Sequence, residues 1–155
     1  EPLNRENGTN PFVLQEQLQD MMSRNVGIIR TKAELEAALT DLEKLGEQAS
    51  TVKAHATSQY NAGWNTALDL RNLLISSEAV SRAALMREES RGAHCRDDFP
   101  GERPEWLKYN IYVWRDSNGS MKIEKRERPE PPPLLKEIAN SKIEDLEAGK
   151  VAGDA

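Results

Sequence analysis

The sequence has a single cysteine, few aromatic residues and no long apolar run. Cys95 cannot form a disulfide within the chain, so stability must come from packing, and a reducing compartment fits. No stretch of about 18 apolar residues is present, as a membrane-spanning helix would require. With 21 Lys and Arg against 26 Asp and Glu the net charge is -5, and no basic block is available to contact phosphate backbones. We therefore expect no nucleic-acid partner.

Motifs for cofactors, metals and nucleophilic catalysis are also missing. No Gly-x-Gly-x-x-Gly pattern and no phosphate loop occur, so we expect no dinucleotide site in this chain. His55 stands alone, and His94 and Cys95 have no second Cys or His at the spacing of metal ligands. Neighbours in sequence seldom direct their side chains at each other, which disfavours a Cys95 nucleophile activated by His94. We expect no catalytic, cofactor-binding or metal-binding residues here.

What the sequence does contain is the apolar spacing of helices. With 155 residues and 37% apolar side chains, the chain is large enough for one domain with one core. Asn10 and Pro11 predict the start of a first helix that ends near Asn25. Thr31 and Glu34 match a capping box, which predicts that a second helix begins at Thr31.

The second and third helices differ in how much of their surface is apolar. In the second helix, apolar positions alternate by three and four residues from Leu35 to Val52, which is typical of a seam packed along a partner helix. The third helix, from about Trp64 to about Glu89, has apolar residues over more than half of its circumference. We therefore expect it to be the central helix, covered on more than one side.

The last third of the sequence changes character twice. Residues 110–115 are rich in β-branched and aromatic side chains, residues 116–119 suit a turn, and residues 120–124 alternate apolar with polar. They predict a β-hairpin whose apolar face lies on the helices or on another domain. From Pro129 onward, four of the eight prolines and an acidic excess mark a tail whose apolar residues form the stripe of a docking helix.

These elements define the expected fold. The fold class is mainly α: a three-helix antiparallel bundle, spectrin-like, with a C-terminal β-hairpin and a Pro-rich tail. We expect residues 1–10 to form an extended lead-in and residues 11–128 to form the bundle with its hairpin. Residues 129–155 then form the Pro-rich acidic tail.

One segment after the third helix is dense in charged residues. Arg91 and Arg96 lie close in sequence to Glu89, Asp97 and Asp98, and planar guanidinium groups suit a network of several hydrogen bonds. A solvated helix end with scattered charges is the plainer interpretation. We favour a contact with a neighbouring domain over catalysis. The expected interface residues are Glu89, Ser90, Arg91, His94, Arg96, Asp97 and Asp98.

The same segment carries a family resemblance. The flavoprotein subunit of succinate dehydrogenases and fumarate reductases has a signature near its C-terminus that resembles the run Glu89-Ser90-Arg91-Gly92-Ala93-His94-Cys95-Arg96-Asp97-Asp98-Phe99-Pro100, followed by Trp106-Leu107-Lys108. Residues 27–30 and 67–74 resemble the same domain. The resemblance covers the chain from about Asn10 to Arg126.

The resemblance implies a parent subunit that interconverts succinate and fumarate and passes electrons through FAD to an iron-sulfur subunit. In that family FAD and the dicarboxylate are held by the flavin-binding and capping domains, whose motifs this sequence lacks. This chain then resembles the C-terminal helical domain alone, which holds no cofactor and is expected to be inactive, with those domains and the iron-sulfur subunit as partners. The implied location is cytoplasmic, peripheral to the inner face of the membrane through partner subunits.

Two further functions stay open at this point. A free-standing helical adaptor would use the seam from Leu35 to Val52 to bind a partner helix, and a small hydrolase would use Ser90 or Cys95. A domain separated from its parent uncovers apolar area, here around Tyr112, Trp114 and Phe99. The isolated chain is therefore expected to self-associate or to shield part of that area with its own C-terminal apolar stripe. The mass of the native gene product separates the first function from the adaptor, because only the first requires a much longer precursor.

Overall fold

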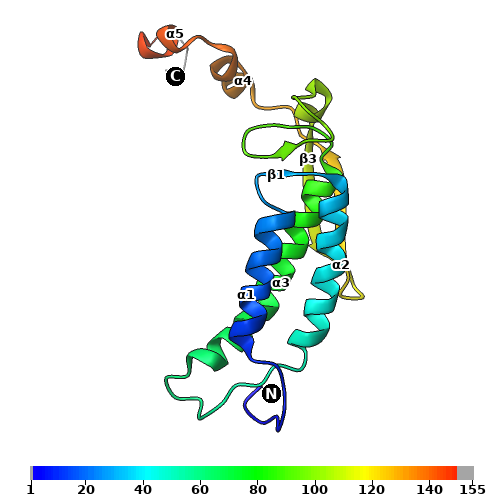
Figure 1. Ribbon diagram of the computed structural model, residues 1–155. Helices are drawn as coiled ribbons and strands as arrows, with labels where there is room; N and C mark the ends of the chain where they lie inside the picture. The colour runs from blue at the N-terminus through cyan, green and yellow to red at the C-terminus, as the bar shows by residue number, and fades with distance from the viewer. Residues whose placement is uncertain (1, 150–155) are drawn as a thin grey trace.

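Figure 1 shows a computed structural model in which residues 2–149 are described. Three long helices, α1 (Pro11–Asn25), α2 (Lys32–Ala49) and α3 (Ala62–Met86), form an antiparallel bundle in which each helix contacts the other two. The predicted mainly α fold with a three-helix bundle is confirmed.

The first two helices begin where their caps predict. The Asn10 side chain accepts a hydrogen bond from the Phe12 amide, and Pro11 occupies the first helical position, where no amide donor is lost. The Thr31 hydroxyl accepts from the Glu34 amide at 3.3 Å, and the Glu34 carboxylate accepts from the Thr31 amide at 2.7 Å. These reciprocal bonds satisfy two amides that have no partner inside α2.

The core lies between the facing sides of the three helices. Its most buried members, each at most 3% exposed, are Leu14, Leu18, Met21, Leu35, Ala38, Val52 and Leu70. The predicted seam on α2 is confirmed, although the helix ends at Ala49 and Val52 enters the core from the following turn. Each large apolar side chain buried in this way stabilises the fold by roughly 1.5–3 kcal/mol.

The helix α3 is less covered than predicted. It contacts α1, α2 and the hairpin, but its buried residues are Ala67, Leu70, Ser81 and Ala84. Four of its large apolar side chains are 37% to 50% exposed: Leu68, Leu73, Ile75 and Val80. The prediction that this helix is covered on more than one side is confirmed by its contacts with α1, α2 and the hairpin, but the cover is incomplete. The number of apolar residues around a helix indicates how much of its surface should be buried against other parts of the protein. Residues 2–149 bury only part of that surface on α3.

Short strands and a hairpin complete the body. The parallel strands β1 (Ile29–Arg30) and β2 (Cys95–Arg96) pair over two residues. The 3-10 helix η1 (Pro104–Lys108) leads into β3 (Tyr109–Arg115), which pairs in antiparallel fashion with β4 (Met121–Glu127). The predicted hairpin is confirmed, with a second strand that runs further than expected.

The hairpin turn forms for the reasons that its residues indicate. The Asp116 carboxylate accepts hydrogen bonds from the amides of Asn118 and Ser120, both at 2.9 Å. Gly119 has a φ of 82°, in the left-handed region that other residues avoid. The two strands contact α3, so the hairpin lies on the bundle as predicted.

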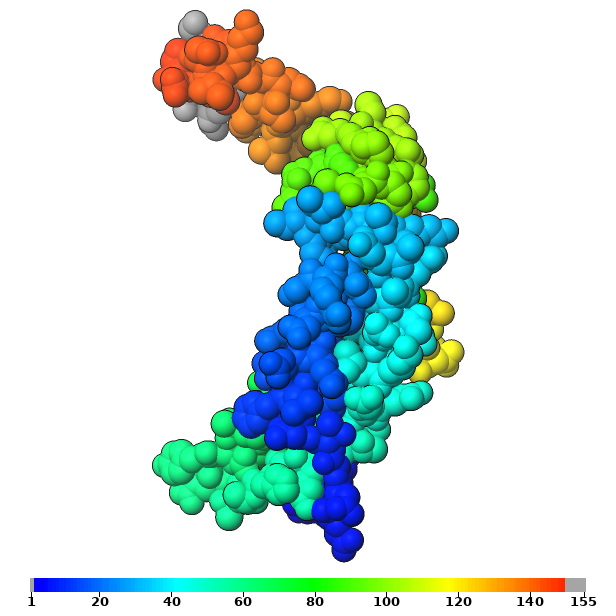
Figure 2. Space-filling view, viewed as in Figure 1, coloured from blue at the N-terminus to red at the C-terminus, as the bar shows by residue number. Residues whose placement is uncertain are grey.

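The two ends of the chain differ from each other in their contacts. Residues 2–10 bend back onto residues 51–54 rather than running extended: a Cβ at Gly8 would collide with the Thr51 carbonyl oxygen. At the other end, α4 (Pro133–Asn140) and α5 (Ile143–Glu147) have no buried residue and project from the body (Figure 2). None of the helices in the described range combines the length and the hydropathy that a membrane span requires. Residues 150–155 of the expected tail lie outside the described residues, and its docking stays a prediction.

We expect Leu70→Ala to lower the free energy of unfolding by about 2–5 kcal/mol, because the lost side chain leaves a cavity in the core. Leu70 is 1% exposed. Leu68→Ala, on the same helix at 47% exposure, is the matched control and should change it by less than about 0.5 kcal/mol. Denaturant melts measure both. A loss below about 1 kcal/mol at Leu70 would mean that the core is not where the structure places it.

Candidate functional site

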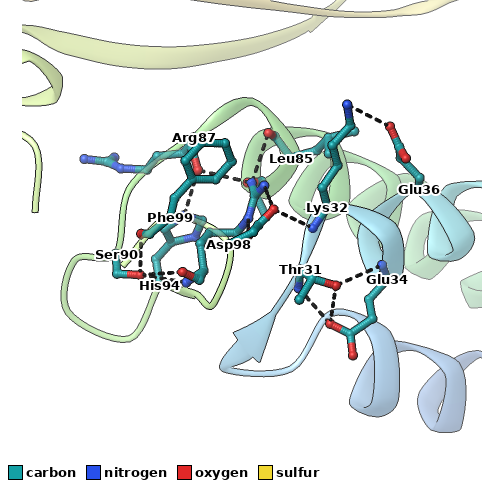
Figure 3. Close-up of polar contacts among 12 residues, drawn as sticks. Thr31, Lys32, Glu34, Glu36, Leu85, Arg87, Ser90, His94, Asp98 and Phe99 are labelled. Carbon is teal, nitrogen blue, oxygen red and sulfur yellow. Dashed lines mark hydrogen bonds and ion pairs between the residues drawn. The ribbon is translucent and has the colours of Figure 1, made fainter. Parts of the chain in front are cut away.

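The segment between α3 and η1, which we call the crossing segment (residues 87–103), lies over the end of the bundle at which α3 ends. Figure 3 shows part of its polar contacts. Within it Glu89 is 0% exposed. Its carboxylate accepts hydrogen bonds from Arg87 at 2.6 and 2.8 Å and from Arg91 at 3.1 Å. The Arg103 amide donates a further one at 2.9 Å.

These donors decide the charge of Glu89. Burial alone would raise the pKa of this carboxyl, because it disfavours the charged form. The hydrogen bonds from Arg91, the Arg103 amide and Arg87 outweigh burial and lower the pKa to about 2. Glu89 is therefore an ionised, fully buried group whose cost of burial is offset by its partners.

Arg96 is a second buried charge of the crossing segment, at 1% exposure. Its guanidinium binds both carboxylate oxygens of Asp98, each at 2.8 Å. Its Nη1 donates to the carbonyls of Ala84, Leu85 and Arg87 at 2.8, 3.1 and 3.3 Å. The last carbonyls of a helix lack helical donors, and a cation is favourable there. Arg96 therefore caps the C-terminal end of α3.

Asp98 joins this arginine to the start of α2 (Figure 3). Its carboxylate accepts a hydrogen bond from the amide of Lys32, the first residue of α2, at 2.9 Å. A negative charge is favourable at a helix N-terminus. The hydrogen bonds from Arg96 outweigh burial and, with the Lys32 amide, hold the pKa of Asp98 well below its ordinary value.

Arg30 of β1 caps the end of α1. Its Nη1 donates to the carbonyls of Val26 and Gly27 at 3.1 and 3.0 Å, directly after the helix. Its Nη2 contacts Nδ1 of His94 at 2.6 Å. Strand pairing places Arg30 opposite Arg96, so two arginines at paired positions cap two different helices. One end of each long helix is thus tied to β1 or to the crossing segment.

His94 uses both of its ring nitrogens within this cluster. Because a guanidinium can only donate, Nδ1 accepts from Arg30, and Nε2 donates to the Arg87 carbonyl at 3.1 Å. Burial lowers the pKa of His94, and the positive charges of Arg30, Arg87 and Arg96 act in the same direction. The hydrogen bond to the Arg87 carbonyl opposes them, but the pKa is lowered overall. The ring is neutral and has no free nitrogen with which to activate Cys95.

Most of the predicted interface residues meet in one cluster. Glu89, Arg91, His94, Arg96 and Asp98 take part through their side chains as described above. Ser90 links the two ends of the loop formed by residues 90–99. Its hydroxyl accepts a hydrogen bond from the Arg96 amide at 2.8 Å and lies 3.1 and 3.0 Å from the carbonyl oxygens of Arg96 and Phe99. Asp97 is exposed and enters through its amide, which donates to the Arg30 carbonyl at 3.1 Å. A further role of these residues at an interface stays a prediction.

Three residues of the cluster were not predicted from the sequence to belong to it: Arg30, Arg87 and Glu102. Arg30 and Arg87 contact the predicted residues directly, and Glu102 pairs with Arg91 at 2.8 Å. Arg30 lies in the stretch 27–30 that carries part of the family resemblance, which was the one signal for it. Its contact with His94 spans 64 residues, and nothing local in the sequence indicates such a pairing.

The cluster has no metal-binding arrangement. Across residues 2–149, no group of three or more His, Cys, Asp or Glu residues is placed to hold a metal ion. The carboxylates of Glu89 and Asp98 are instead taken up by arginines. What the geometry supports is a rigid, charged scaffold at one end of a bundle.

Comparison with known proteins identifies the domain. The model of the family described as fumarate reductase flavoprotein C-term matches residues 15–144. The chain belongs to this family. The match continues past Arg126, where the resemblance was expected to end, and includes α4.

Relatives of this flavoprotein C-terminal domain are much longer proteins. A fumarate reductase (CoM/CoB) subunit of Methanothermobacter marburgensis is 37% identical over 102 residues, which are 66% of this chain and 19% of that protein. The succinate dehydrogenase flavoprotein subunit of Coxiella burnetii is 36% identical over 115 residues, which are 72% of this chain and 19% of that protein. The chain spans about a fifth of the length of these curated relatives.

A solved structure shares the fold over nearly the whole domain. Mycobacterium smegmatis Sdh1 in complex with UQ1 superposes with a TM-score of 0.79 at 34% sequence identity. The similarity covers 94% of this chain and 25% of that chain. The flavoprotein C-terminal domain therefore has the same architecture inside a much larger polypeptide.

We expect Glu89→Gln to destabilise the domain by about 3 kcal/mol, because it leaves Arg87 and Arg91 without their shared buried carboxylate. Glu102→Gln, at a side chain that is 62% exposed, is the matched control and should cost less than about 1 kcal/mol. Urea melts at neutral pH compare the two. An equal, small effect of both substitutions would contradict the assigned role of Glu89.

We expect Arg96→Lys to destabilise the domain by about 2–4 kcal/mol, because an ammonium group cannot bind Asp98 in two places and cap α3 at the same time. Arg126→Lys, at an arginine that is 48% exposed in its pair with Glu124, is the control and should be nearly neutral. Thermal unfolding measures both. An Arg96→Lys variant as stable as the original domain would show that the forked geometry is not needed.

Proposed function

We propose that this chain is the C-terminal structural and docking domain of a flavoprotein subunit that interconverts succinate and fumarate with FAD. The family match over residues 15–144 carries the proposal. The relatives named above as succinate dehydrogenase and fumarate reductase subunits are about five times as long as the part that this chain matches, which leaves room for the catalytic domains.

The residues of this domain do not fit FAD by themselves. A dinucleotide-binding fold places a pyrophosphate on a helix N-terminus that follows a strand and a glycine-rich turn. Here β1 leads directly into α2, and the first amides of α2 are already bonded to the side chains of Thr31 and Asp98. In the proposal FAD is held by the flavin-binding domain of the parent subunit, with the dicarboxylate between it and the capping domain.

The proposed partners are those two domains, together with an iron-sulfur subunit that receives the electrons. Uncovered apolar side chains support a neighbouring body: Leu68 and Val80 on α3 are 47% and 50% exposed, and Ile28 and Ile29 beside the crossing segment are 67% and 62% exposed. Without its neighbours, the domain would self-associate through such area. The parent complex would lie in the cytoplasm, peripheral to the inner face of the membrane through partner subunits.

The adaptor alternative loses its binding surface in this structure. The seam that a partner helix would use is filled by the chain itself, since Leu35, Leu42 and Val52 are 0%, 6% and 1% exposed. The contacts that bury them come from the bundle, in which α2 packs against both α1 and α3. The docking domain of a longer subunit is therefore the better supported function.

A chimera tests the proposal. We expect the flavoprotein subunit of Coxiella burnetii, with its matching C-terminal part replaced by residues 10–149 of this chain, to retain bound flavin and to oxidise succinate. The isolated chain should purify without a flavin absorbance band and without activity. An isolated chain that carries flavin, or a native gene product no longer than this chain, would overturn the proposal.

A further inference from the structure

The contact between Arg30 and His94 has the geometry of a switch. We propose that it is an acid-sensitive latch: it holds β2 of the crossing segment to β1, between α1 and α2, while His94 is neutral, and it opens when the imidazole gains a proton. The latch lies wholly within this chain, and it does not depend on the flavin chemistry of the proposed function.

Arg30 is unusually dependent on this one imidazole. Within residues 2–149 no carboxylate forms an ion pair with Arg30, and its Nε is buried without a hydrogen-bond partner. The guanidinium is held by two carbonyls after α1 and by the lone pair of His94 Nδ1. His94 is accordingly the side chain that anchors Arg30 to the crossing segment.

Protonation of His94 removes that lone pair. Nδ1 then carries a proton that points at an N–H group of Arg30, and the two nitrogens are 2.6 Å apart. The imidazolium would also face cations from every element around it: Arg30 on β1, Arg87 after α3 and Arg96 on β2. Two donors with like charge cannot share this distance, so the contact must open.

The two carboxylates that bind arginines and backbone amides inside the cluster are not free to compensate the new charge. Glu89 is bound by Arg87 and Arg91, and Asp98 is bound by Arg96 and the Lys32 amide. Both carboxyl groups have lowered pKa values, so they stay ionised from neutral to mildly acidic pH and do not titrate with the latch. Among the charged groups of this cluster, His94 is the one whose charge changes in that range.

The parts that the latch joins have few other attachments. The backbone of the crossing segment meets β1 through the short parallel pairing of β2, flanked by hydrogen bonds of 3.1 Å from the Cys95 amide to Ile28 and from the Asp97 amide to Arg30. Asp98 remains bonded to Lys32, and Arg96 remains bonded to α3, when His94 is charged. Opening is therefore local: β2 separates from β1 while the bundle stays folded.

The direction of the pH effect follows from the pKa of His94. Because burial and the surrounding arginines lower it in the folded chain, the unfolded or opened form binds a proton more readily. The contribution of the latch to stability is full above the ordinary histidine value of 6.5 and is lost as the pH falls through that value toward the lowered pKa.

Hydrogen exchange tests the latch in the whole chain. We expect the protection factors of the Cys95 and Asp97 amides, corrected for the intrinsic effect of pH, to fall about tenfold between roughly pH 7.5 and pH 5. The Leu42 amide within α2 should keep its protection over the same range. Unchanged protection of Cys95 and Asp97, or an equal loss at Leu42, would overturn the latch.

Two substitutions separate the latch from general acid effects. His94→Gln keeps a neutral acceptor for Arg30 and a donor for the Arg87 carbonyl, so it should abolish the acid-induced loss. His55→Gln, at the second of the two histidines in the chain, should leave the loss unchanged. A His94→Gln variant that still loses protection in acid, or a His55→Gln variant that no longer does, would refute the assignment.

A measurement on the unaltered chain keeps the proposal testable if His94→Gln does not fold. Nitrogen chemical shifts of the His94 ring report its tautomer and its titration. We expect the Nε2–H tautomer at neutral pH and a titration midpoint below the ordinary histidine value. An Nδ1–H tautomer, or a midpoint above that value, would overturn the latch.

Discussion

The ion pair between Arg96 and Asp98 is the contact on which the arrangement of the helix ends depends. One planar guanidinium binds a carboxylate in two places and still reaches the last carbonyls of α3, while the same carboxylate reaches the first amide of α2. The C-terminal end of one helix and the N-terminal end of another carry opposite partial charges, and the pair satisfies both. The relative position of α2 and α3 at this end is therefore fixed by two side chains.

The buried carboxylate of Glu89 makes the crossing segment rigid rather than strongly stable. A buried ion pair gains little over a well-packed apolar substitute, because removing both charges from water is costly. Removing one partner is different, since it leaves the other charge buried and unpaired. Glu89 binds Arg87, Arg91 and the Arg103 amide, so one buried carboxylate holds three positions of the loop between α3 and η1. A fixed loop of this kind suits a surface on which a neighbouring domain is positioned.

The parts of this structure that could be predicted are those in which the relevant residues are close in sequence. The caps at Asn10 and Thr31 and the turn after Asp116 involve partners within four residues, and each formed as expected. The charged cluster could be located, because its members lie in one segment. Its internal pairing could not, since Arg30 reaches it from 64 residues away and a guanidinium has several carboxylates to choose from. The direction in which Arg96 turns, inward to α3, is a property of the folded chain.

The misjudged burial of α3 has a physical reason that bears on function. Only some of its apolar side chains are buried by the bundle. Leu70 packs in the core, whereas Val80 is 50% exposed. The aromatic residues show the same division. The guanidinium groups of Arg96 and Arg103 lie over the Phe99 ring, at 4.9 and 5.0 Å from its centroid, and Phe99 is only partly exposed. Trp114 of the hairpin has one guanidinium above it and stays 40% exposed. The chain thus shields Phe99 with its own arginines, whereas apolar side chains on α3 and the hairpin stay exposed. That exposed side of the domain requires a neighbour to cover it.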